Sequence, residues 1–169
     1  YRDKQSTPAT RLAMAASLAR LCHAYAVPLI INDDVRLALE CGAQGVHLGR
    51  DDTDVPAARR LLGEAAIIGV SCYNEGERAR RAQDQGADYV AFGRFFPSRT
   101  KPHAVPASLD LLRSARAELS LPIVAIGGIT AENGAALVAA GAHALAVIEG
   151  LWGQGDVRAA AARYAQLFH

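Results

Sequence analysis

Cysteine and aromatic residues are scarce in this chain. Of its 169 residues, three are cysteine and 6% are Phe, Trp or Tyr. Three cysteines are an odd number, and Cys22, Cys41 and Cys72 lie at no metal-like spacing. We therefore expect reduced structural thiols in a cytoplasmic protein rather than disulfides or a cysteine metal site.

Strong net charge and long apolar runs are also lacking. The formal charge of +1 gives no field that would argue for nucleic acid or a membrane surface as a partner. The most apolar long window, residues 135–153, is interrupted by His143, Glu149 and glycines, which disfavours a membrane span. No signal-like segment opens the chain, and no Gly-x-Gly-x-x-Gly follows a first strand, which disfavours a dinucleotide fold.

Short apolar runs alternate with segments of helical spacing. We predict strands at residues 29–31, 45–48, 67–71, 89–93, 123–127 and 144–148. Predicted helices cover residues 10–25, 35–41, 55–62, 75–85, 109–119, 132–140 and 157–168. Short strands separated by helices indicate a parallel sheet with the helices outside it.

The repeated pattern favours a TIM (β/α)8 barrel. Three predicted helices end in a Gly-Ala step just before a strand, at residues 41–43, 85–87 and 140–142. Residues 1–4 resemble the carboxyl end of a further strand, whereas a complete barrel needs roughly 200 residues or more. We thus expect a single barrel domain over residues 1–169, lacking its first strand, first helix and most of strand 2. A smaller open α/β sheet is the alternative.

Two of the predicted strands end on acids. Asn32 and Asp33 follow the first, and Asp52 comes shortly after the second. Because the carboxyl ends of parallel strands share one edge of a sheet, these oxygens suit Mg²⁺, which shares hard oxygen ligands with substrate phosphates. Each acid also has a plainer reading, since Asp33 could cap the helix that follows it and Asp52 could be a turn or N-cap residue.

Other predicted strand ends carry groups that suit phosphates. Arg2 and Lys4 lie on one face of the first strand end, and Ser71 ends a later strand. Cations favour a pyrophosphate bridged by Mg²⁺, and a Gly-Gly turn that opens a helix lets backbone N–H groups approach a second phosphate. Further candidates are Ser98, Arg99, Thr100, Lys101, Gly127, Gly128, Ile148 and Glu149. Taken singly, Ser71 could be a structural hydroxyl, Gly127-Gly128 a tight turn and His47 a core histidine.

Together these motifs resemble thiamine phosphate synthase. The resemblance covers essentially the whole chain, at residues 1–4, 29–33, 45–52, 69–71, 86–90, 92–93, 97–101 and 125–130. It implies a TIM barrel that couples hydroxymethylpyrimidine pyrophosphate to thiazole phosphate and yields thiamine phosphate and pyrophosphate. The cofactor would be Mg²⁺, and the only partners implied are these small-molecule substrates.

The resemblance also implies a role for each matching residue. Asp33 and Asp52 would bind Mg²⁺, and Arg2, Lys4 and Lys101 would be catalytic by neutralising the leaving pyrophosphate. Arg2 and Lys4, with Asn32, would hold the pyrimidine pyrophosphate, and Ser71 and Lys101 would also touch the pyrimidine substrate. The thiazole phosphate would be bound by Ser98, Arg99, Thr100, Gly128, Ile148 and Glu149.

This chain departs from the family pattern in three places. The Gln that opens the family's Gln-x-Arg-x-Lys motif is missing, and Thr-x-Thr-Lys reads Ser-Arg-Thr-Lys at residues 98–101. Glu149 stands where many members have Ser beside a phosphate. Because a carboxylate repels phosphate, we expect Glu149 to point away or to contact the ligand only through its backbone N–H.

Two rival functions remain open from the sequence. A thiazole tautomerase shares the barrel and the thiazole phosphate site but needs no pyrophosphate site, so Arg2, Lys4, Asp33, Asp52 and Lys101 favour the synthase. A non-catalytic phosphate-binding protein, or an inactive fragment of the enzyme, is the rival from another class.

Overall fold

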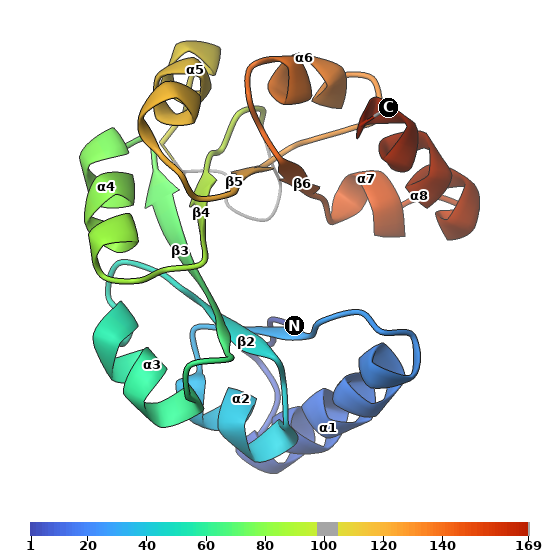
Figure 1. The fold of residues 1–169 in the computed structure, drawn as a ribbon. Helices are drawn as coiled ribbons and strands as arrows, with labels where there is room; N and C mark the ends of the chain where they lie inside the picture. Colours follow the sequence, from blue (N-terminus) through green and yellow to red (C-terminus); the bar gives the residue numbers. More distant parts are fainter. Residues whose placement is uncertain (98–104, 169) are drawn as a thin grey trace. The chain divides into compact units, whose positions relative to one another are not determined.

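The computed structural model describes residues 1–97 and 105–168, in which helices and parallel strands alternate (Figure 1). The chain forms two compact units. The first comprises Tyr1–Ser71 and Asp84–Asp88, and the second comprises the rest of the described chain. The fold is α/β, with six parallel strands in the described ranges.

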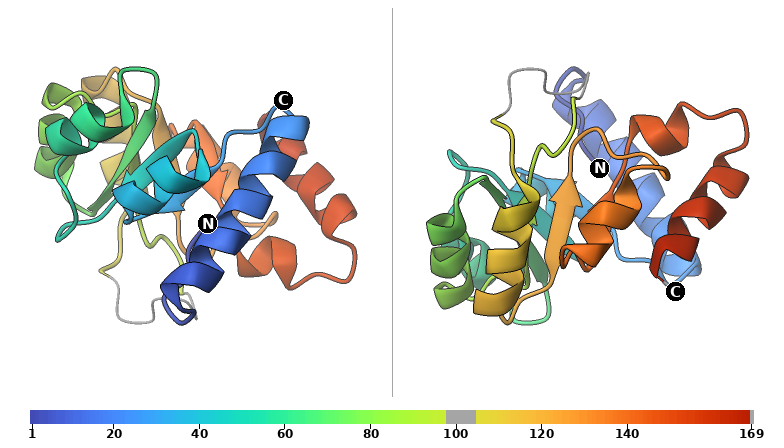
Figure 2. Two further views of the ribbon diagram at one scale, coloured as in Figure 1. Left: turned by 90° about the horizontal axis from the view of Figure 1, so that it is seen from below. Right: turned by 90° about the horizontal axis from the view of Figure 1, so that it is seen from above.

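The first unit contains three strand–helix repeats. It is built from α1 (Pro8–Ala24), β1 (Ile30–Asn32), α2 (Val35–Cys41), β2 (Gly45–Leu48), α3 (Val55–Leu62) and the first part of β3 (Ile67–Tyr73). The strands are parallel in the order β1-β2-β3, and α2 packs against both α1 and α3 (Figure 2).

Side chains alternate between the two faces of these strands. Ile31, Val46 and Ile68 are opposite one another in register and are almost completely buried. The next row joins Asn32, His47 and Gly69 and therefore lies on the other face. Burial of the apolar row contributes roughly 1.5–3 kcal/mol per side chain, so it fixes the strand register and with it the face of the polar row.

Each helix of the first unit begins at a side-chain cap. Thr7 accepts a hydrogen bond from the backbone N–H of Thr10, 3.3 Å away. Asp34 caps α2 by accepting from Leu37 N at 2.9 Å, and Asp54 caps α3. Because these oxygens satisfy N–H groups that have no partner within the helix, each cap contributes about 1 kcal/mol.

Residues 1–4 run alongside β1, as expected for a neighbouring strand end. The backbone nitrogen of Tyr1 donates to Ile30 O at 2.7 Å, and Asn32 N donates to Tyr1 O at 2.9 Å. This pair of hydrogen bonds is the pattern of a parallel bridge. It places Arg2 and Lys4 next to the carboxyl end of β1.

The second unit repeats the same alternation. It contains all but the last residue of α4 (Gly76–Asp84), together with β4 (Tyr89–Phe92), α5 (Leu109–Glu118), β5 (Ile123–Ile126), α6 (Gly134–Ala139), β6 (Ala144–Ala146), α7 (Glu149–Trp152), α8 (Val157–Ala165) and the 3₁₀ turn η1 (Gln166–Phe168). Its strands are parallel in the order β4-β5-β6, and α8 packs against α7 and η1.

All six predicted strands and seven predicted helices are confirmed, with ends shifted by a few residues. The largest difference is at the last strand, which ends at Ala146 and is followed by the unpredicted helix α7. Residues 144–148 read as one apolar run, of which only the first three residues form the strand. Helix α7 has four residues, too few to show a helical period in the sequence. The eight-stranded barrel is not confirmed, since the described ranges hold six strands.

The described helices include none long and apolar enough to cross a membrane. All three cysteines are free, in agreement with the expectation of reduced thiols. Burial raises the pKa of the Cys72 thiol to about 12 and also raises the pKa of Cys41. Both buried thiols are therefore protonated at neutral pH, whereas Cys22 is only half-buried.

We predict that Ellman's reagent modifies only Cys22 rapidly in the folded protein at pH 8. The thiolate is the reactive form, and burial denies both ionisation and access to Cys41 and Cys72. After unfolding in guanidinium, all three thiols should react at similar rates. Equal reaction of three thiols in the folded protein would contradict the buried placement.

Candidate magnesium and phosphate site

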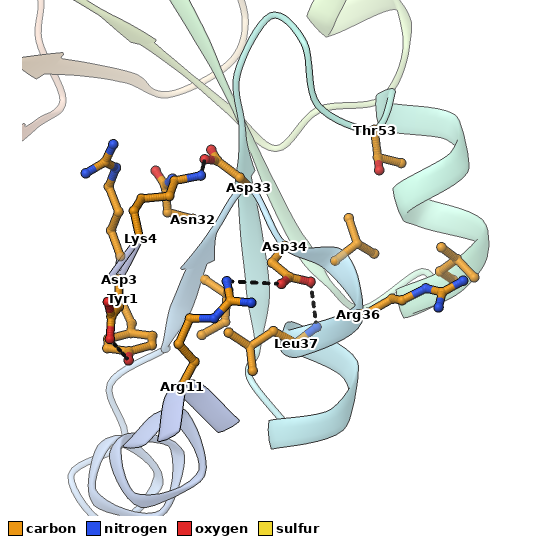
Figure 3. A pocket seen from close by; sticks show the side chains of 14 residues that line it. Tyr1, Asp3, Lys4, Arg11, Asn32, Asp33, Asp34, Arg36, Leu37 and Thr53 are labelled. Atoms are coloured by element: carbon orange, nitrogen blue, oxygen red, sulfur yellow. Dashed lines mark hydrogen bonds and ion pairs between the residues drawn. The ribbon is translucent and has the colours of Figure 1, made fainter. Parts of the chain in front are cut away.

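A pocket of about 550 Å³ lies within the first unit, beside the carboxyl end of β1 (Figure 3). This is within the usual range for small-molecule sites. Four of the predicted site residues line it: Arg2, Lys4, Asn32 and Asp33. The structure thus brings together the cations and one of the acids that the sequence suggested for pyrophosphate.

The ammonium group of Lys4 forms an ion pair with Asp33 in this pocket (Figure 3). The Lys4 side chain is half-exposed, and 24% of the Asp33 side-chain surface is accessible. The acid is therefore partly withdrawn from water while its partner still reaches solvent. In this arrangement the lysine partly neutralises the acid and stays accessible to an anion.

The backbone of Asp33 leaves β1 in an unusual conformation. Its φ is +67°, in the left-handed region that few residues other than glycine, asparagine and aspartate adopt. Its N–H donates to the carbonyl oxygen of His47 at 2.8 Å, which ties the turn to β2. After this left-handed turn the side chain of Asp33 meets Lys4, whereas the side chain of Asp34 caps α2.

Asp52 lies next to Asp33 and has a perturbed carboxyl group. Its Oδ2 accepts a hydrogen bond from Gly49 N at 2.6 Å. Burial raises the pKa of Asp52, and a hydrogen bond to the Asp33 carboxyl together with the negative charge of Asp33 raises this pKa further. Two carboxyl groups from separate loops therefore share one small space.

The capping alternatives for these two acids are wrong. Asp34, not Asp33, caps α2, and Asp54, not Asp52, caps α3. Arg11 also forms an ion pair with Asp34, at 3.8 Å (Figure 3). The capping acids are thus satisfied locally. Asp33 and Asp52 face each other, and the hydrogen bond from Gly49 N to Asp52 agrees with the turn alternative for Asp52.

The chemistry of this acid pair fits Mg²⁺. No group of three or more His, Cys, Asp or Glu side chains suited to a metal occurs in the described part of the chain. Mg²⁺ does not need one, because it is often held by one or two carboxylates together with water and substrate phosphates. Burial is the main cause of the raised pKa of Asp52, and the charge of Asp33 adds to it. A divalent cation would relieve the repulsion between the two acids.

Ser71 and His47 lie in the same unit as the acid pair, and the backbone carbonyl of His47 accepts from Asp33 N. Nε2 of His47 is 2.8 Å from Oγ of Ser71, and both residues are half-buried. The sequence indicated Ser71 as a substrate contact and His47 as a core histidine, but it did not indicate that the two touch. The alternation of each strand could have shown that both belong to the polar face.

In the second unit, the predicted Gly-Gly turn follows β5. Gly127 and Gly128 have φ of +94° and +65°, and a Cβ on Gly128 would collide with the carbonyl oxygens of Phe96 and Pro97. Asn133, which the sequence did not single out, donates to Gly128 O at 3.2 Å. Helix α6 begins only at Gly134, so the expectation that this turn opens a helix is wrong.

Ile148 and Glu149 form the start of α7, which lies against the loop after the Gly-Gly turn. A Cβ on Gly150 would collide with the carbonyl oxygen of Ile129 and the hydroxyl of Tyr164. The carboxylate of Glu149 is folded toward the other end of α7, where a Cβ on Gly153 would lie 3.0 Å from its Oε1. Glu149 thus points away from the start of α7. Ser98, Arg99, Thr100 and Lys101 lie outside the described residues.

A family model for thiamine monophosphate synthase matches residues 1–151. The chain belongs to the thiamine monophosphate synthase family. A thiamine-phosphate synthase from Nitrosococcus oceani is 60% identical over 168 residues, which cover 99% of this chain and 77% of that protein. One from Thiobacillus denitrificans is 55% identical over 99% of this chain and 80% of its own length. The resemblance seen in the sequence motifs is confirmed, and this is a family of transferases.

Solved structures agree with membership of the thiamine monophosphate synthase family. The thiamine phosphate pyrophosphorylase of Pyrococcus furiosus has a TM-score of 0.87 and 31% identity, covering 99% of this chain and 80% of that one. A 3-hexulose-6-phosphate synthase has a TM-score of 0.69 at 17% identity, covering 92% of this chain and 81% of that one. The second likeness shows the fold alone.

We predict that Asp52→Asn stabilises the protein in EDTA at pH 7 while abolishing its response to Mg²⁺. A carboxyl with a raised folded-state pKa loses stability as pH rises through its titration range, so the neutral amide removes this cost. Asparagine also keeps an oxygen that can accept from Gly49. Thermal melts should show a gain of a few degrees in EDTA, and this gain should shrink toward pH 4.

The matched control is Asp51→Asn, which removes an exposed neighbouring acid. This control and the wild type should both be stabilised by millimolar Mg²⁺, because ligand that binds the folded state raises its stability. Equal Mg²⁺ stabilisation of Asp52→Asn and wild type would contradict the site.

Proposed function

We propose that this protein transfers the hydroxymethylpyrimidine group from its pyrophosphate to a thiazole phosphate, giving thiamine phosphate and pyrophosphate. The observation that carries the proposal is the pairing of Asp33 with Asp52 beside Lys4. Family membership supports the reaction. A Mg²⁺ ion held by the acid pair, together with Lys4, would supply the positive charge that a departing pyrophosphate requires.

In this proposal Asp33 and Asp52 hold Mg²⁺, which when bound neutralises charge that develops on the pyrophosphate. Lys4 and Arg2 line the pocket together with Asp33 and would contact the phosphate oxygens directly. Asn32 would donate from its amide, and Lys101 would add a further cation from outside the described residues. Preorganised charges of this kind stabilise the transition state without reorganisation during the reaction.

The proposed reaction depends on electrostatic stabilisation of the leaving pyrophosphate rather than on acid–base catalysis. The amino group of the pyrimidine donates electron density as the C–O bond to pyrophosphate breaks, and both bonding electrons leave with the pyrophosphate. The resulting pyrimidine methyl cation is captured by the lone pair of the thiazole nitrogen. Ser71 would orient the pyrimidine for this capture.

The thiazole phosphate would bind to the second unit. Gly128, Ile148 and the backbone N–H of Glu149 are candidates, and Ser98, Arg99 and Thr100 would complete the site. The outward fold of the Glu149 carboxylate supports this assignment, because it removes the like charge expected to repel phosphate. The N–H groups of such a turn suit an anion.

For the fold, we propose the (β/α)8 barrel as a single domain. The parallel bridge between Tyr1 and β1 supports it, because it adds a strand neighbour beyond the six strands described. The proposed location is the cytoplasm, where the buried thiols would remain reduced. A thiazole tautomerase is less well supported, since it has no use for the acid pair and Lys4.

The direct test is to incubate the purified protein with both phosphorylated substrates and Mg²⁺, and to measure thiamine phosphate and pyrophosphate. Lys4→Ala and Lys101→Ala should each lower kcat/KM by about 10²-fold, the scale of losing one preorganised electrostatic donor. Arg60→Ala, which removes an exposed cation on α3, is the control and should retain wild-type turnover.

Three outcomes would contradict the proposal. Isomerisation of a thiazole phosphate without coupling would favour the tautomerase, and binding of both substrates without product would favour a non-catalytic protein. Wild-type turnover in Lys4→Ala would remove that residue from the mechanism.

A further inference from the structure

His47 contacts two residues of the proposed pyrimidine site with different atoms. Its imidazole Nε2 lies 2.8 Å from the hydroxyl oxygen of Ser71 on β3. Its backbone carbonyl accepts the N–H of Asp33 after β1, also at 2.8 Å. A single residue on the middle strand of the first unit therefore holds both a proposed substrate contact and a proposed magnesium ligand.

The register of the strands explains how His47 reaches Ser71. His47 is directly opposite Gly69, which has no side chain to occupy the space beside it. Ser71 is two residues further along β3, so it projects from the same face as Gly69. The imidazole can thus lean along β3 and meet the hydroxyl one step nearer the carboxyl end of the sheet.

A serine hydroxyl gains a defined direction from such a neighbour. Its side chain can occupy three staggered rotamers, and its O–H rotates to suit whatever partner is near. An imidazole held on a buried strand fixes one rotamer and uses part of the hydrogen-bonding capacity of the hydroxyl. A hydroxyl held in one rotamer would meet a ligand in a constant direction, which would lower the entropy lost on binding.

We propose that His47 is a positioning residue that orients Ser71 for the pyrimidine substrate and does not itself contact it. This rests on the proposed function. The effect of His47 on the pyrimidine passes through Ser71, whereas its effect on Asp33 passes through a backbone carbonyl that any residue at position 47 supplies. Replacement of the side chain therefore separates the two contacts.

The test is a double-mutant cycle with His47→Leu and Ser71→Ala. Each single variant should lower kcat/KM for the pyrimidine pyrophosphate roughly tenfold, the scale of one hydrogen bond lost or misdirected. The double variant should fall no further than Ser71→Ala alone, because residues that act through one another are not additive. The KM for thiazole phosphate and the stabilisation by Mg²⁺ should stay at their wild-type values.

Two further variants make the readout specific to positioning. His47→Gln places an amide nitrogen near the position of Nε2 and should recover most of the lost kcat/KM, which a merely space-filling role would not do. His23→Leu removes an exposed histidine on α1 and should leave all parameters unchanged. Circular dichroism of each variant reports whether it is folded.

The same four proteins are then compared by calorimetry, which gives the Kd of the pyrimidine pyrophosphate in the presence of Mg²⁺ and without thiazole phosphate. This separates the inference from the proposed reaction, because absent product in the wild type rejects the reaction while the binding cycle still tests His47. Additive losses in the double variant, failure of His47→Gln to recover binding, or wild-type behaviour of His47→Leu would each overturn the inference.

Discussion

The hydrogen bond from the backbone of Asp33 to the carbonyl of His47 determines where the acids of the first unit point. It ties the turn after β1 to the neighbouring strand while Asp33 is left-handed. The chain can then continue directly into α2, with Asp34 as its cap. Without this turn, successive side chains would continue to alternate along the strand, and Asp33 could not meet both Lys4 and Asp52 in the same way.

Neighbouring acids in this unit have different tasks because their surroundings differ. Asp34 and Asp54 each accept a hydrogen bond from a backbone N–H group in the first turn of the helix that follows. Such a cap gives a carboxylate a hydrogen-bond partner within its own segment of chain. Asp33 and Asp52 are brought together against their mutual repulsion, and the positive charge of Lys4 partly offsets the rise in the pKa of Asp52. Such strain at a strand end is typical of functional sites rather than of structural ones.

Much of this arrangement could be predicted from the sequence, and the failures have physical causes. Strand bodies and most helix ends followed from apolar periodicity and glycine stops, and motifs identified the family. Whether Asp33 and Asp52 cap a helix depends on the φ of Asp33 and on the loop between Gly49 and Asp52. Neither can be read from the order of apolar and polar residues. Helix α7 was missed because it has only four residues, which are too few to show a helical period. The contact of His47 with Ser71 needed the strand register.

The left-handed conformation of Asp33 has a consequence for how this position can vary in evolution. A residue that replaces Asp33 must first be able to adopt the left-handed conformation, which costs most L residues roughly 1–2 kcal/mol. Glycine and asparagine adopt this conformation readily but lack the negative charge. Glutamate brings the charge but is disfavoured by the backbone. Aspartate is the one acid that suits both, so the fold narrows the choice at this position to a single carboxylic acid.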